Sequence, residues 1–318
     1  CLKKYHQLCQ CLNLMTLGLN YNTFYKKPGL KGTINDFFNR KKIIVPALKE
    51  INLQIADGAF IGLIGPNGAG KTTLTKILTG ILEPTTGTVR VDNFVPHEKS
   101  HVFLKQIGVM FGQKSQLSWD LPAIDTLNML SYIYELDSKE YKKRLSELCT
   151  LLDAQMIIRT PVRKLSLGQR VKCELMCALI HPPKYLFLDE PTLGLDLVTQ
   201  NRIYAFLKKE NKEKNTTIIL TSHNVQDIKA MAKQIIILAN GSIIYQGNIN
   251  KLPLNINKSD SFTLKYYVNG KKTIQEKTLN SSDLKQELKK LPAEDILQIN
   301  RVGISLEELI MEIYNEHQ

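Results

Sequence analysis

The stretch Gly65-Pro66-Asn67-Gly68-Ala69-Gly70-Lys71-Thr72 decides how this chain folds. It follows a short apolar run, Phe60–Ile64, and precedes a helical pattern with Leu74, Ile77 and Leu78 on one side. Glycines let backbone N–H groups turn inward, and a helix N-terminus adds a dipole that favours an anion. The pattern G-x-x-x-x-G-K-[S/T] between a strand and a helix therefore predicts a phosphate-binding loop.

The side chains of this loop have distinct expected roles. Lys71 is expected to reach the β- and γ-phosphates of a nucleotide and to assist catalysis, and the Thr72 hydroxyl to bind Mg²⁺. The residues expected to contact the nucleotide here are Gly65, Pro66, Asn67, Gly68, Ala69, Gly70, Lys71, Thr72 and Thr73.

A second motif, Tyr185-Leu186-Phe187-Leu188-Asp189-Glu190, ends an apolar run with two carboxylates. A buried strand of this kind delivers its last residues to the carboxyl edge of a parallel sheet, where nucleotides bind. We expect Asp189 to hold Mg²⁺ and Glu190 to polarise the attacking water. Many buried strands end in Asp, so the motif gains its meaning from the phosphate-binding loop.

Composition places the chain among ordinary globular proteins. It has 318 residues, 43% hydrophobic and 23% charged, with a net charge of +12. The basic excess is compatible with a nucleic-acid or anionic-lipid surface, but no long basic run is present, which favours lysines spread over solvated faces. No stretch approaches the roughly 20 consecutive apolar residues of a membrane-spanning helix, so we expect membrane action only through a partner.

Cysteines and the N-terminus carry little functional information. Cys173 and Cys177 lie four residues apart, one helical turn, and their spacing favours core packing over a zinc site. The chain starts at Cys1 and its first residues lack the pattern of a signal peptide. We expect residues 1–15 to be a non-native or disordered extension, with Met15 near the natural start.

The remaining chain alternates strands and helices. Apolar runs at 185–188, 217–220 and 235–238 are interleaved with helical patterns, which predicts a mainly parallel sheet buried on both faces. Residues 120–165 form a helical insert, whose longest helix has Asp137 or Ser138 as its N-cap. The pattern of residues 71–82 predicts a helix after the loop.

Beyond residue 250 the composition changes. Residues 248–261 are rich in Asn, Lys and Ser and indicate a linker. A hairpin turning at Asn269-Gly270, a helix with Leu284 and Leu288, a strand at 296–302 and a last helix opened by a capping box at residues 305–308 are expected to follow. Together they predict a small α+β unit.

The two motifs and four further segments resemble the nucleotide-binding domains of ATP-binding cassette (ABC) proteins. Leu165-Ser166-Leu167-Gly168-Gln169 is similar to the family's LSGGQ signature, with Leu167 in place of the first glycine. Gly194-Leu195-Asp196 resembles the loop that crosses the family's dimer interface. The resemblance implies that Ser166, Gly168 and Gln169 contact the γ-phosphate held by a second copy.

The resemblance also implies two sensors of the γ-phosphate and Mg²⁺. His223, after a strand, is similar to the family's switch histidine, and Gln113 to the glutamine that senses Mg²⁺ and the attacking water. Because Gly112 looks inserted, Gln116 is the alternative to Gln113. Trp119, in the following segment, either faces a membrane subunit or packs in the protein.

One family feature is missing from its usual place. The aromatic residue that stacks on adenine in this family is replaced by Lys42. An apparent insertion at 28–42 moves this role to Tyr25, Phe37 or Phe38, and the preference for ATP over GTP is implied by the family alone.

The resemblance implies an α/β fold of the P-loop NTPase type. The ABC cassette, residues 16–250, would combine a RecA-like core, an antiparallel β subdomain and an α-helical subdomain at about 115–180. A small α+β accessory domain would occupy 251–318. The insertion near Pro28, the Gly-Gln-Lys-Ser-Gln stretch at 112–116 and the tail Ser305–Tyr314 look like ATPase subunits of bacterial exporters.

We therefore expect an ATPase that uses ATP and Mg²⁺, dimerises head to tail and drives separate transmembrane permease subunits from the cytoplasmic face of the membrane. The alternative is a soluble ATPase of the same family that acts on ribosomes or DNA. The single cassette, without a long coiled coil, favours the transporter.

Overall fold

The computed structural model describes residues 10–24, 42–112, 115–222, 225–252, 261–268 and 273–302, together with Ile310 and Tyr314. The chain divides into two compact units, Cys1–Asn250 and Lys251–Gln318. Each unit is described by itself.

A six-stranded sheet forms the centre of the first unit, in the order β5-β6-β7-β3-β8-β9. All neighbours are parallel except β8 and β9, which are antiparallel. The mainly parallel sheet expected from the apolar runs is confirmed. The strands are β3 (Phe60–Ile64), β5 (Ile107–Met110), β6 (Tyr185–Asp189), β7 (Thr217–Thr221), β8 (Gln234–Ala239) and β9 (Ser242–Asn248).

A second, antiparallel sheet has the order β2-β1-β4. Its strands are β1 (Gln10–Phe24), β2 (Lys42–Ala56) and β4 (Thr86–Val91). The expected cassette boundary at residue 16 falls inside β1, and Cys11, Leu12 and Leu14 are buried. Residues 10–15 therefore belong to a strand of this sheet and not to a disordered extension, because Cys11, Leu12 and Leu14 place their side chains in the core.

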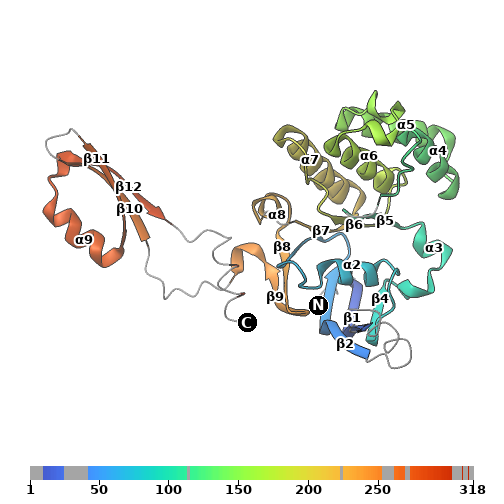
Figure 1. Cartoon of the computed structure of the whole chain (residues 1–318), viewed down its shortest axis with the longest axis horizontal. Coiled ribbons are helices and arrows are strands. Elements are labelled where there is room, and N and C mark those ends of the chain that lie inside the picture. The colour runs from blue at the N-terminus through green and yellow to red at the C-terminus, as the bar shows by residue number, and fades with distance from the viewer. Residues whose placement is uncertain are drawn as a thin grey trace, which may run out of the picture. The chain divides into compact units, whose positions relative to one another are not determined.

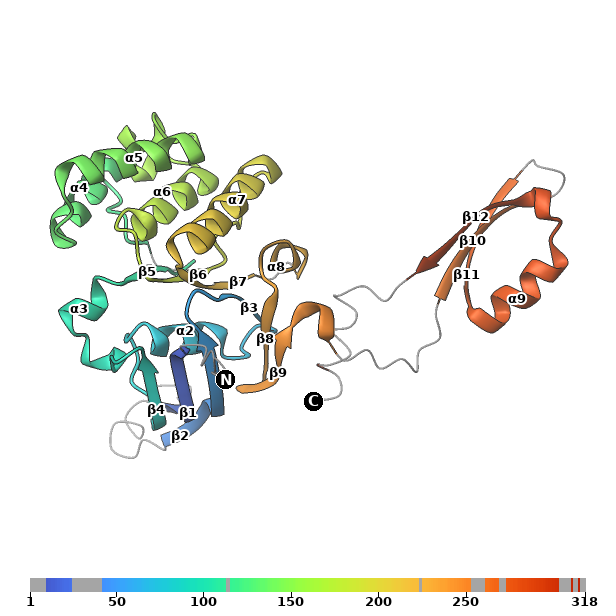
Figure 2. The ribbon, with the colours of Figure 1, turned by 180° about the vertical axis from the view of Figure 1, so that it is seen from behind.

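Helices cover both faces of the central sheet (Figure 1). Helix α2 (Lys71–Leu78) lies between that sheet and the three-stranded one, while α4 to α7 cover the other face, as Figure 2 shows from behind. The remaining helices are α3 (His101–Leu104), α4 (Ala123–Ile133), α5 (Ser138–Leu152), α6 (Leu167–Leu179), α7 (Leu197–Lys214) and α8 (Val225–Met231), with short 3-10 turns at Pro96–Glu98, Ile157–Arg159, Val162–Lys164 and Ile249–Lys251.

The start of α5 and the end of α2 can be compared with what the local sequence predicted. Asp137 caps α5 by accepting hydrogen bonds from the backbone of Lys139 and Glu140, as expected for one of the two candidates. Helix α2 ends at Leu78, four residues before the expected end. The reason is Gly80, whose φ of 75° is left-handed and whose added Cβ would lie 2.1 Å from the Pro96 carbonyl oxygen.

The second unit contains an antiparallel sheet, order β11-β10-β12, with one helix beside it. Leu264 and Tyr266 of the sheet pack with Leu284 of the helix. The expected hairpin and last strand are confirmed, whereas Asn269-Gly270 and the capping box at 305–308 lie outside the described residues. The elements are β10 (Ser261–Val268), β11 (Thr273–Asn280), α9 (Ser281–Lys290), the 3-10 turn Ala293–Asp295 and β12 (Ile296–Val302).

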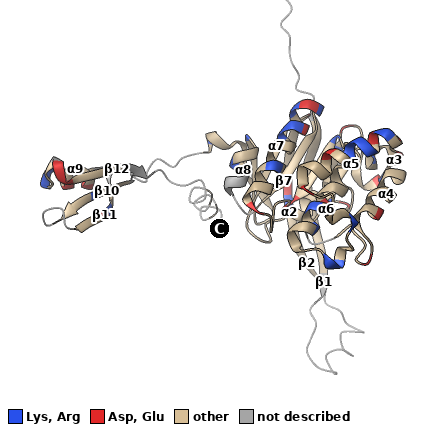
Figure 3. Cartoon of the chain, turned by 90° about the horizontal axis from the view of Figure 1, so that it is seen from above, with Lys and Arg blue, Asp and Glu red and all other residues tan. Residues whose placement is uncertain are grey.

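Basic residues are dispersed over several helices. Residues 251–318 hold ten Lys and Arg against ten Asp and Glu, so the excess charge of +12 belongs to residues 1–250. Lys and Arg lie on α5 and α7 among others, with acidic residues between them (Figure 3). Among the residues that the structure describes, no helix is both long and apolar enough to span a bilayer.

Candidate nucleotide-binding site

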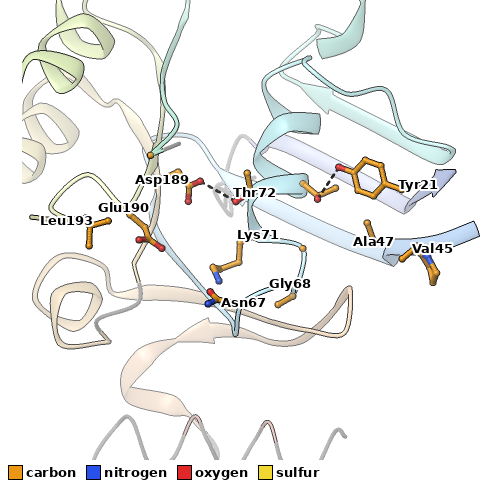
Figure 4. A pocket seen from close by; sticks show the side chains of 15 residues that line it. Tyr21, Val45, Ala47, Asn67, Gly68, Lys71, Thr72, Asp189, Glu190 and Leu193 are labelled. Atoms are coloured by element: carbon orange, nitrogen blue, oxygen red, sulfur yellow. Dashed lines mark hydrogen bonds between the residues drawn. The ribbon is translucent and has the colours of Figure 1, made fainter. Parts of the chain in front are cut away.

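A cavity of about 650 Å³ opens where the phosphate-binding loop meets the carboxyl ends of the central strands. The loop and the N-terminus of α2 form its floor, β6 delivers two carboxylates to one side, and β1 and β2 close the other (Figure 4). Its wall consists of Tyr21, Val45, Pro46, Ala47, Asn67, Gly68, Ala69, Gly70, Lys71, Thr72, Thr73, Gly112, Asp189, Glu190 and Leu193.

Two glycines explain the shape of the loop. Gly70, at the N-cap of α2, has a φ of 105°, and a Cβ there would lie 2.6 Å from a Leu48 methyl carbon. A Cβ on Gly65 would lie 2.6 Å from the Leu238 carbonyl oxygen. Only glycine fits both positions without a shift of its neighbours, and a glycine-rich turn of this kind can present backbone N–H groups to a phosphate.

Lys71 lies at the centre of this floor. Its ammonium donates hydrogen bonds to the carbonyl oxygens of Gly65 and Pro66, at 2.6 and 3.1 Å. Burial lowers the pKa of Lys71, while the carboxylates of Glu190 and Asp189 oppose that shift. Gly65 and Pro66, which do not line the cavity, thus hold the Lys71 ammonium in place.

Asp189 and Thr72 place a carboxylate and a hydroxyl oxygen next to each other at the cavity. Thr72 Oγ1 donates to Asp189 Oδ2 at 3.2 Å, and the Thr221 hydroxyl donates to the other carboxylate oxygen. Mg²⁺ prefers hydroxyl, carboxylate and water oxygens, and it is usually bound by one or two such groups plus substrate phosphates. The hydroxyl and carboxylate present therefore fit a magnesium ion beside a nucleotide.

Glu190 occupies an unusual backbone conformation. Its φ is 55°, in the left-handed region that few non-glycine residues adopt. Its backbone N–H donates to the Thr221 carbonyl and hydroxyl oxygens, at 3.1 and 3.2 Å. These bonds to β7 hold the strained residue in place, with its side chain at the cavity beside Lys71 (Figure 4).

Tyr21 is a wall residue that sequence reasoning missed. It lies opposite Val45 in the β1–β2 register, and its hydroxyl lies 3.4 Å from Thr73 Oγ1. Its ring is 41% exposed at the mouth of the cavity. The aromatic candidates named from the sequence, Tyr25, Phe37 and Phe38, lie outside the described residues.

The signature segment, Leu165–Gln169, lies away from this cavity. Ser166 caps α6, accepting from the Gln169 backbone at 3.3 Å, and Gln169 Oε1 accepts from the Ser166 backbone at 3.0 Å. Leu167 is 59% exposed, and Gly168 approaches the Gly194 carbonyl closely. None of the described residues that line the cavity comes from this segment.

Of the three candidate sensor residues, the structure describes only Gln116. Gln113 and His223 lie outside the described residues. Gln116 does not line the nucleotide cavity: its amide donates to the Val109 carbonyl at 2.6 Å, and it faces a second cavity of about 330 Å³ beside Tyr134 and His181. Trp119 is half exposed, with the Arg170 guanidinium 4.6 Å from its ring centre.

Comparisons with known proteins agree with this geometry. Residues 48–193 match the family model described as ABC transporter. The ABC transporter ATP-binding protein NatA of Bacillus subtilis is 32% identical over 215 residues, which cover 68% of this chain and 87% of NatA. The chain belongs to the ATP-binding proteins of ABC transporters.

Other relatives extend the match. The methionine import ATP-binding protein MetN of Streptococcus pyogenes serotype M3 is 27% identical over 292 residues, covering 88% of this chain and 81% of MetN. A solved ATP-binding cassette, a dimer in a post-hydrolysis state with ADP and Pi, is 26% identical, with a TM-score of 0.61 over 74% of this chain and 98% of that one.

Membership of the family fixes the fold and the chemistry. The expected ABC-type P-loop fold is confirmed, with its mainly parallel core sheet and its antiparallel β subdomain. ABC cassettes are ATPases coupled to transport, and this chain is an ATPase that uses ATP with Mg²⁺.

Proposed function

We propose that two copies of this chain bind two ATP–Mg²⁺ head to tail and drive separate membrane subunits of an exporter. The observation that carries the proposal is the half-site. Lys71, Thr72, Asp189 and Glu190 surround one cavity, while Ser166 caps a helix on another surface of the same copy. A second copy, turned by a two-fold axis, would bring its Ser166 to the open side of the first copy's cavity.

The residues would share the reaction as follows. The loop Gly65–Thr73 binds the phosphates, with Lys71 between the β- and γ-phosphates. Thr72 and Asp189 hold Mg²⁺, whose charge offsets that of the phosphates. Glu190 accepts a proton from the attacking water and orients it. Gln113 and His223 would sense the γ-phosphate and the metal.

Tyr21 supplies the adenine side of the proposed site. It stands at the cavity mouth next to Val45 and Ala47, an apolar wall that suits a flat base. An aromatic ring there can stack on adenine, which is worth about 1–3 kcal/mol in base–aromatic pairs. We therefore assign the stacking role to Tyr21, in place of the three residues favoured from the sequence.

The membrane subunits would dock beside the second cavity. Trp119, Leu121 and Ile133 are exposed apolar residues, and Tyr132 is 82% exposed. Trp119 and Leu121 precede the start of α4 and the other two lie at its end, so a partner that covers them would lie along this helix. The nearby Lys105 and His101 add polar and basic contacts to the wall.

Transport direction separates the exporter from an importer. The relatives include MetN, whose name states methionine import, so the exporter proposal rests on the sequence resemblance at Pro28–Lys42 and Ser305–Tyr314. NatA and MetN are both ATP-binding proteins of transporters, which favours a transporter over an ATPase acting on ribosomes or DNA.

The experiment is to purify the chain from native membranes with the membrane protein that accompanies it and to reconstitute both in vesicles, with the ATPase facing outward. For an exporter, ATP added outside should move substrate from the outer medium into the lumen, away from the ATPase. The Glu190→Gln variant should bind ATP, hydrolyse it at least about a hundredfold more slowly and move nothing. Movement out of the lumen would contradict export, and near-normal hydrolysis by Glu190→Gln would contradict its role.

A further inference from the structure

Glu174, in the middle of α6, is a buried carboxylate bonded to the segment that follows β5. Its side chain is 8% exposed. The Ser115 hydroxyl donates to one carboxylate oxygen, and the Gln116 backbone N–H donates to the other at 3.2 Å. Burial raises the pKa of Glu174, while hydrogen bonds from Ser115, Gln116 and Leu117 oppose that shift. The two groups that donate directly to the carboxylate, from Ser115 and Gln116, come from one short segment.

The same segment is fastened again a few residues later. The Trp119 carbonyl accepts from the Arg163 backbone at 2.9 Å, and the Leu121 carbonyl from the Val162 backbone at 3.1 Å. The Arg170 guanidinium covers the Trp119 ring. Residues 115–121 are therefore attached to the chain on both sides of the signature segment, Leu165–Gln169.

Two ends of this arrangement reach the two halves of the proposed site. Gly112, just before the segment, lines the nucleotide cavity and lies close to the Asp189 carbonyl. Ser166 begins α6 eight residues before Glu174, about 12 Å along the helix axis. The bonds at Glu174 thus lie between the edge of one cavity and the segment presented to another.

Stability of the fold alone does not explain a carboxylate at this buried position. Desolvating a charge costs several kcal/mol, and a well-packed apolar side chain of similar size is often as stabilising. What the charge provides is direction. The Ser115 hydroxyl and the Gln116 N–H must both face it, and the Leu117 N–H donates to the Ser115 hydroxyl oxygen at 3.1 Å, so residues 115–117 have one position on α6.

We propose that Glu174 is a positioning residue for ATP hydrolysis. It holds residues 115–117 on α6, so that the edge of a copy's own nucleotide cavity and the Ser166–Gln169 surface it offers to the second copy move as one body. This inference rests on the proposed head-to-tail dimer.

The test uses the full-length chain and two single variants, Glu174→Gln and Ser115→Ala. Glu174→Gln places an amide N–H₂ where donors converge, and kcat for ATP should fall about tenfold, the factor expected for one lost charge-assisted hydrogen bond. The Kd for ATP, measured in a Glu190→Gln background, should stay within about twofold, because no cavity residue is changed. Ser115→Ala is the milder change and should lower kcat in the same direction.

Two controls make the result specific. The double variant should be no slower than Glu174→Gln alone, because both changes remove the same contact. Glu210→Gln alters another buried, hydrogen-bonded carboxylate, paired with Arg144, and should reduce stability while keeping kcat.

The inference is overturned if Glu174→Gln keeps wild-type kcat, if ATP binding weakens in proportion to kcat, or if Glu210→Gln slows hydrolysis equally. An unmutated chain whose hydrolysis never depends on a second copy would instead overturn the proposed function.

Discussion

At the scale of single residues, the site depends on short contacts between residues of the two sequence motifs. Lys71 and Asp189 are 118 residues apart in sequence, yet Thr72 donates a hydrogen bond to Asp189 at the carboxyl edge of the sheet. Sequence reasoning could place them together because parallel strands end at one edge. It could not find Tyr21, whose place at the cavity follows from a pairing with Val45 more than twenty residues away.

Tyr21 gives the prediction at this scale. Replacing Tyr21 with Ala should raise the KM for ATP about tenfold or more, since base–aromatic stacking is worth about 1–3 kcal/mol. The Tyr21→Phe variant keeps the ring, loses only the hydroxyl near Thr73 and should stay within about threefold of the unmutated chain. Steady-state kinetics measure both, and an unchanged KM in Tyr21→Ala would place the adenine elsewhere.

At the scale of elements, local patterns predicted most strands and helices of the core. Apolar runs bounded by turns marked β3, β6, β7 and β8, and a capping residue marked the start of α5. Two elements differ from what was expected. The start of strand β1 was expected to be an extension that ends at Met15. Helix α2 ends before the expected residue because Gly80 lies against the Pro96 backbone, a contact between residues distant in sequence.

Strand β1 yields the prediction at this scale. Leu12 has no exposed surface, whereas Met15 in the same strand is 55% exposed. Leu12→Ala should lower the free energy of unfolding by about 2–5 kcal/mol, because it removes buried methyl groups and leaves a cavity. Met15→Ala, the matched control, should change it by less than about 0.5 kcal/mol. Denaturant unfolding of both variants measures this, and equal stability would show that residues 10–15 lie outside the folded cassette.

At the scale of the whole molecule, each proposed ATP site is formed by residues from two copies of the chain. Among the described residues of one copy, Asp189 and Glu190 line the cavity, whereas Ser166, which caps α6, is not among the lining residues. The sequence could suggest this division only through resemblance, because no local pattern encodes what a second copy contributes. Leu167, exposed in place of a glycine, would be one of the side chains that the second copy covers.

The most direct test of that division is complementation between two inactive variants. Glu190→Gln spoils a copy's own cavity, while Ser166→Asp keeps the helix cap but places a negative charge against the γ-phosphate offered by the partner. In a mixed dimer both defects fall in one site and the other site is intact. The ATPase rate of an equal mixture should therefore recover to roughly a quarter of the unmutated rate, as random pairing allows. A mixture no more active than the two variants measured separately would contradict the shared site.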